Sequence, residues 1–104
     1  MDPVGCVSGI AMVVGISMPT QQRAIRIIIE TERRGIVAGE ALMGFEAASL
    51  YYSCVLEGEK KTQKQIAYVA NVTEVTIRNI TRGLEKRLLS HARIQPHLRR
   101  STLH

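Results

Sequence analysis

The stretch TQKQIAYVANVTEVTIRNITRGLEKRL, residues 62–88, decides the fold. Thr62 is followed three residues later by Gln65 and then by apolar positions, which is the pattern of a capping box at the start of a helix. The pattern then breaks at Asn71, a residue type that tolerates the left-handed backbone of a tight turn, and Thr73 can cap a second helix. Two helices that meet across about three residues predict a helix-turn-helix.

The second of these helices has two distinct faces at about 100° per residue. Four apolar residues lie within an arc of about 80° and are predicted to pack inward: Ile77, Ile80, Leu84 and Leu88. The opposite face carries Val75, Arg78, Asn79, Arg82 and Lys86. Gly83 lies inside this helix and weakens it by about 1 kcal/mol relative to alanine.

This geometry points to DNA, because a helix-turn-helix places the first turns of its second helix in the major groove. Arg78 can bind guanine through two hydrogen bonds, Asn79 can do the same with adenine, and Val75 can touch the thymine methyl group. We therefore predict base contacts from these three residues. Phosphate or supporting contacts are predicted for Thr62, Lys64, Thr73, Thr76, Arg82 and Lys86. The alternative interpretation of this stripe is an ordinary solvated helix face.

The distribution of charge favours a polyanionic partner. The 104 residues carry a net charge of +5. Residues 1–81 contain eight Lys or Arg and eight acids, whereas residues 82–104 contain six Lys or Arg and one acid. The whole excess therefore lies on the last helix and the residues after it, as expected of a surface that meets nucleic acid. A solvated basic tail is the alternative.

Three more helices are expected before this motif. The first runs from about Pro3 to Val14 and is strongly apolar, so we expect it to be buried or covered by a partner. The second begins after Ser17, its predicted cap, and ends before Gly35. The third, from about residue 41 to residue 56, is apolar nearly all round and belongs in the middle of a bundle. Tyr51 and Tyr52 are expected in the core.

The predicted fold class is therefore all-α, a five-helix bundle with a C-terminal helix-turn-helix. We expect one domain over residues 1–90 and a basic, flexible tail over residues 91–104. No segment shows the sustained alternation of a β-strand. The apolar run between Val4 and Met18 is shorter than the ~20 residues that span a bilayer, so no membrane association is expected.

Catalysis, metals and cofactors are not expected. Cys6 and Cys54 form no C-x-x-C pair, and both are predicted to be reduced thiols, with Cys54 a small core residue. Three histidines lie in the polar C-terminal segment without partners at ligand spacing: His91, His97 and His104. No nucleophile motif or phosphate-binding loop is present.

The segment EGEKKTQKQIAYVANVTEVTIRN, residues 57–79, resembles the second cyclin-like repeat of archaeal transcription factor B, the counterpart of the eukaryotic general initiation factor IIB. The similarity runs from Asp2 to Leu88. It implies a cyclin-like bundle whose helix-turn-helix reads a promoter element just upstream of the TATA box, in double-stranded DNA bound by the TATA-binding protein. It also implies that Val75 and Arg78 contact bases, with Thr76 and Asn79 nearby.

The family's zinc ribbon and first repeat have no counterpart in these residues, so we expect the chain to correspond to the second repeat alone. RNA polymerase, which the ribbon recruits, would then be contacted only through parts absent here. The expected location is the cytoplasm of an archaeal cell, at the nucleoid, or the nucleus of a eukaryote. Two alternatives remain: a cyclin-like protein–protein interaction module without sequence-specific DNA binding, and a bacterial-style regulator that dimerises through its first helix.

Overall fold

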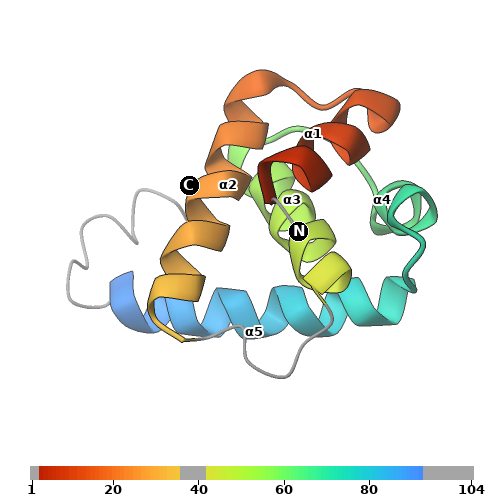
Figure 1. Ribbon diagram of the computed structural model, residues 1–104. Helices are drawn as coiled ribbons and strands as arrows, with labels where there is room; N and C mark the ends of the chain where they lie inside the picture. Colours follow the sequence, from red (N-terminus) through yellow and green to blue (C-terminus); the bar gives the residue numbers. More distant parts are fainter. Residues whose placement is uncertain (1–2, 36–41, 93–104) are drawn as a thin grey trace.

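The computed structural model describes residues 3–35 and 42–92, and all regular structure within them is helical. The described residues form five helices, shown in Figure 1: α1 (Pro3–Val14), α2 (Met18–Arg33), α3 (Leu42–Glu57), α4 (Gln63–Ala70) and α5 (Glu74–Ala92). The predicted all-α fold is confirmed. Helix α5 passes through Gly83 without interruption and ends four residues beyond Leu88. The tail was predicted to begin at residue 91, but residues 91 and 92 belong to α5, and residues 93–104 lie outside the described residues.

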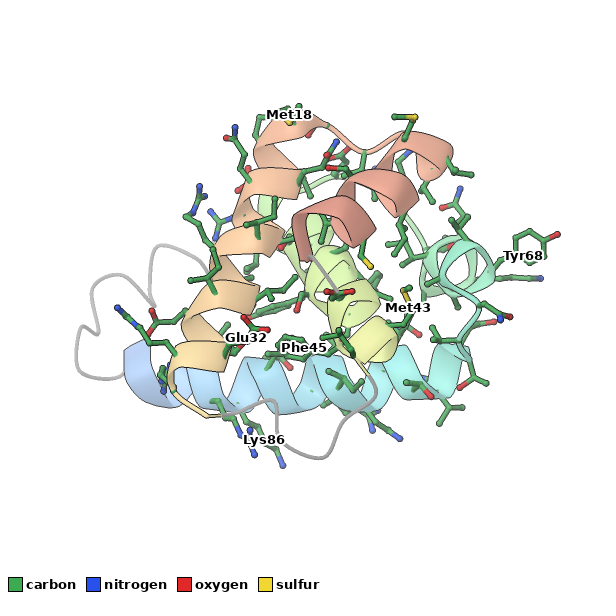
Figure 2. The ribbon with its side chains drawn as sticks, viewed as in Figure 1. Met18, Glu32, Met43, Phe45, Tyr68 and Lys86 are labelled. Atoms are coloured by element: carbon green, nitrogen blue, oxygen red, sulfur yellow. The ribbon has the colours of Figure 1, made fainter. Side chains whose placement is uncertain are left out.

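Helix α3 is the centre of the bundle and packs against each of the other four helices (Figure 1). Every residue from Gly44 to Leu50 is buried, which confirms the central position predicted from its apolar surface. Figure 2 shows Phe45 in the interior between α3 and α5. Glu46 is fully buried too, and none of the described residues donates a hydrogen bond to its carboxylate.

The other helices each bury one stripe against α3. Helix α1 contributes Val7, Ile10 and Ala11 to the core, and α2 contributes Ala24 and Ile28. The described helices include none that is long and apolar enough to cross a membrane.

Ser17 is the N-cap residue of α2, as predicted, but the capping hydrogen bond expected of its side chain is absent. Its backbone is in an extended conformation. Its hydroxyl and its backbone N–H each donate to the carboxylate of Glu59 at 2.8 Å, and Thr20 Oγ1 donates to the same carboxylate at 2.5 Å. Hydrogen bonds to a charged carboxylate are stronger than the bond by which a neutral hydroxyl caps a helix. The bonds to Glu59 therefore orient the Ser17 side chain, and they tie the loop after α3 to the start of α2.

Candidate nucleic-acid interface

The helix-turn-helix begins with the predicted capping box. The N–H of Gln65 donates to Thr62 Oγ1 at 3.0 Å, and the N–H of Thr62 donates to Gln65 Oε1 at 2.9 Å. These two bonds satisfy backbone donors that a free helix start would leave without partners. The short helix α4 therefore has a defined first turn.

The turn between α4 and α5 follows the predicted chemistry. Asn71 has φ 58° and ψ 44°, the left-handed conformation, and it is the one non-glycine residue with positive φ in the described part of the chain. The N–H of Val72 donates to the carbonyl of Ala67 at 3.1 Å and closes the end of α4. Thr73 then caps α5, because its Oγ1 accepts the N–H of Thr76 at 3.1 Å.

The hydroxyls of Thr73 and Thr76 also lie 2.9 Å apart and hydrogen-bond to each other. Both side chains, which were predicted to support DNA contacts, are therefore engaged in fixing the first turn of α5. Their contribution to an interface is to hold that turn in place.

The apolar face of α5 packs as predicted. Ile77 and Leu84 are fully or almost fully buried, and Ile80 and Leu88 are partly buried against the core. The opposite face is exposed at Val75, which is 54% exposed, and at Asn79, Arg82 and Lys86. Figure 2 shows Lys86 pointing away from the bundle.

Arg78 differs from the other members of this face because it is half-buried. It lies at the edge of a hollow of about 320 Å³ formed where α3, the start of α4 and α5 meet. The lining residues are Tyr51, Tyr52, Val55, Gln63, Arg78, Thr81, Arg82 and Glu85. Arg78 and the exposed Arg82 both line this hollow, and Arg78 is the more buried of the two.

Sequence reasoning missed the contribution of Tyr51 and Gln63 to this hollow. Both tyrosines were predicted in the core, but Tyr51 is half-buried and only Tyr52 is buried. Helix α3 buries side chains in every direction between Gly44 and Leu50, so its all-round apolar pattern carried no signal that separates the two rings. Burial, together with the charge of Glu85, raises the pKa of Tyr52, whose hydroxyl is therefore protonated at neutral pH.

Thr62 and Lys64 lie elsewhere. They line a groove between α1 and α4 together with Val13 and Tyr68, and not the hollow beside α5. Figure 2 shows Tyr68 pointing outward from α4, away from the bundle. The structure therefore brings the predicted residues of α5 together and separates Thr62 and Lys64 from them.

Three of the cations on α5 are available to a ligand. Within the described part of the chain, Arg78, Arg82 and Lys86 form no ion pair with a carboxylate. The recorded ion pairs join Arg23 to Glu57 and Arg33 to Glu30, on the α2 side of the bundle. Arginine and lysine without an internal partner favour a polyanion at this face.

In the described residues, four helices pack around the central α3, and the last two helices in chain order, α4 and α5, are joined by a capped turn. This arrangement is that of a cyclin-like helical bundle. The chain belongs to the transcription factor TFIIB repeat family, whose model matches residues 1–87. This confirms the resemblance found in the sequence.

Relatives from several archaea share this region. The chain is 44% identical over 87 residues to transcription initiation factor IIB 2 of Thermococcus kodakarensis, which covers 84% of this chain and 28% of that protein. Transcription initiation factor IIB of Pyrococcus horikoshii is 44% identical over 88 residues, 85% of this chain and 29% of that protein. The factor of Methanopyrus kandleri is 51% identical over 65 residues, 62% of this chain and 21% of that protein. The match spans less than a third of each relative.

Proposed function

We propose that this chain is the second cyclin-like repeat of a general transcription initiation factor of the archaeal type. In this role it recognises a promoter element upstream of the TATA box and acts together with the TATA-binding protein. Membership of the TFIIB repeat family supports the assignment. The main structural support is the surface of the capped helix α5, where Val75 and Asn79 are exposed. Beside them lie Arg78, Arg82 and Lys86, which form no ion pair in the described chain.

The position of each residue along α5 determines whether it contacts bases or phosphates. Its first two turns enter the major groove, where Val75, Arg78 and Asn79 face base edges. Arg82 and Lys86, one and two turns further along, meet phosphates and supply affinity that does not depend on sequence. Thr73 and Thr76 fix the first turn through their hydrogen bonds.

A gel shift with promoter and scrambled duplexes, with and without the TATA-binding protein, tests the proposal. Arg78→Ala is expected to cost about 1–3 kcal/mol at one base pair and to reduce the preference for the promoter sequence. Lys86→Ala is expected to weaken both duplexes equally and to reduce the slope of log affinity against log salt by about 0.9. Arg26→Ala, an exposed arginine on α2, is the matched control and should change neither.

Two results would contradict this function. If the wild-type chain shifted no duplex at low salt, even with the TATA-binding protein present, DNA recognition would be wrong. Retained binding of the TATA-binding protein in that experiment would favour the interaction module. If Arg78→Ala discriminated promoter from scrambled DNA as the wild type does, base reading would belong to other residues.

A further inference from the structure

The hollow beside α5 brings two further polar side chains next to Arg78. Tyr51 of α3 and Gln63, the first residue of α4, line this space of about 320 Å³ together with Arg78. All three residues are half-buried. They come from three different helices, so it is the packing of the bundle that places them around one hollow.

The polar groups of these three residues are not used by the fold. Within residues 3–35 and 42–92, no hydrogen bond involves the Tyr51 hydroxyl, the Gln63 amide or the Arg78 guanidinium, and Arg78 forms no ion pair. Because each side chain is only half-buried, water can satisfy these groups in the free protein. Their hydrogen-bonding capacity is therefore available in a complex.

The backbone on two sides of the hollow is firmly held. Tyr51 lies on the central helix α3, beside buried Tyr52 in the chain. Gln63 directly follows Thr62, whose capping box with Gln65 fixes the first turn of α4. Both polar side chains therefore extend from backbone that is already in place before a ligand binds.

DNA binding by Arg78 creates a need for hydrogen-bond acceptors on the protein side. A guanidinium has five N–H donors, and a guanine accepts two of them. A bound duplex removes water from the remaining N–H groups, and a buried donor without an acceptor costs free energy. A base contact from Arg78 is therefore strongest when the protein accepts the N–H groups that do not face the base.

Tyr51 and Gln63 are better suited to this role than the other polar residues of the hollow. The hydroxyl oxygen of Thr81 is completely buried, Tyr52 is buried, and Glu85 is an exposed carboxylate. A carboxylate would hold the arginine by a charge-assisted bond and compete with the base. The Tyr51 hydroxyl and the Gln63 amide oxygen are neutral acceptors, which can bind the arginine without this competition.

We infer that Tyr51 and Gln63 are positioning residues for base reading by Arg78. In the complex with DNA, Tyr51 Oη and Gln63 Oε1 accept the N–H groups of Arg78 that do not face guanine. They thereby aim the guanidinium at one base, so α3 and the start of α4 contribute to sequence preference without touching DNA. The inference rests on the proposed function, because it concerns the same contact between Arg78 and a base.

Variants that remove one acceptor and keep the shape of the side chain test this inference. Tyr51→Phe and Gln63→Met are each expected to reduce the preference for promoter over scrambled duplex about twofold to tenfold, with unchanged affinity for the scrambled duplex. Tyr68→Phe and Gln22→Met are the matched controls, because both residues are exposed and neither lines the hollow. Thermal melts of the whole chain establish that each variant is folded.

The same substitutions in an Arg78→Ala background separate positioning from a structural role. With no guanidinium to position, Tyr51→Phe and Gln63→Met should reduce the preference no further. An equal reduction in that background would overturn the inference, since the two residues would then act independently of Arg78. A Tyr51→Phe and Gln63→Met double variant that discriminates as well as the wild type would overturn it too.

The wild type and Arg78→Ala, measured beside these variants, report on the proposed function itself. If the wild type prefers the promoter and Arg78→Ala removes that preference, base reading stands, and the Tyr51 and Gln63 variants alone decide the inference. If the wild type shows no preference, or Arg78→Ala retains it, base reading by Arg78 and this inference are both wrong.

Discussion

A Cβ atom added to Gly44 would lie 2.9 Å from Cγ2 of Thr76, so α3 and α5 meet where no side chain fits between them. Ile80 Cδ1 lies 3.4 Å from the same position. Thr76 is held on its other side by its hydrogen bonds to Thr73. The first turns of α5, which carry the proposed base contacts, are thus seated directly on the backbone of α3.

Gly44→Ala is expected to lower the melting temperature. The gain in helix propensity is about 1 kcal/mol, whereas overpacking at a rigid contact costs about 1–3 kcal/mol. Adding Thr76→Ser should restore stability, because serine lacks Cγ2 and keeps the hydroxyl that bonds Thr73. Gly83→Ala is the control: a Cβ there meets nothing within 4 Å, so this change should stabilise the protein. A destabilised Gly83→Ala together with an unaffected Gly44→Ala would show that the contact with Thr76 is unimportant.

Glu59→Gln is expected to be less stable than the wild type at neutral pH. In acid, the difference in stability between the two proteins should become smaller. Hydrogen bonds from Thr20, then from Ser17, lower the pKa of Glu59 below its ordinary value of 4.5. A carboxylate with a lowered pKa stabilises the fold above pH about 4.5, and this contribution is lost as the pH falls through the folded pKa.

Because Glu59 is only half-buried and water screens its carboxylate, the loss at pH 7 should be about 1 kcal/mol, or about 5 °C in melting temperature. Melts of wild type and Glu59→Gln at pH 7 and pH 3 measure it, with exposed Glu32→Gln as the control. An equal deficit at both pH values would mean that the charge of Glu59 contributes nothing.

Cys54 is expected to resist thiol reagents in the native protein. Burial, with a smaller effect from the charge of Glu59, raises the pKa of Cys54 to about 11, so the reactive thiolate is scarce at neutral pH. A Cys6→Ser variant isolates this thiol. Labelling with a disulfide reagent should be slow until denaturant unfolds the chain, and rapid labelling of the native variant would show that α3 opens readily.

Asn71→Ala is expected to cost about 1 kcal/mol, because alanine is strained in the left-handed conformation that this turn requires. Asn71→Gly should be close to neutral, since glycine adopts positive φ without a steric penalty. Denaturant unfolding of the pair measures the difference. Equal stability of the two variants would indicate that the turn relaxes.

The helix-turn-helix was predictable because its signals are local. The capping box, the left-handed Asn71 and the cap at Thr73 each depend on residues within one turn, and all three are observed. Ser17 failed as a cap because its partner, Glu59, is 42 residues away in sequence. The burial of Glu46 could not be foreseen either, since sequence patterns place carboxylates at the surface.

The candidate site was predicted only in part, for a similar reason. Helical periodicity correctly grouped Val75, Asn79, Arg82 and Lys86 on one exposed face. It could not show that Arg78 borders a hollow with Tyr51 and Gln63, because these residues come from three different helices. Nor could it show that Lys64 and Thr62 face α1, since that depends on how α4 is rotated in the bundle.

The half-buried position of Arg78 also lowers the conformational entropy that this side chain loses when it binds DNA. An arginine in open solvent gives up about 2 kcal/mol of rotamer freedom when a ligand fixes it. Half-buried Arg78 has already lost part of that freedom against the walls of the hollow, whereas exposed Lys86, which does not line the hollow, has not. Because Arg78 is partly ordered before DNA binds, its contact with a base should cost less conformational entropy than the contact of Lys86 with a phosphate.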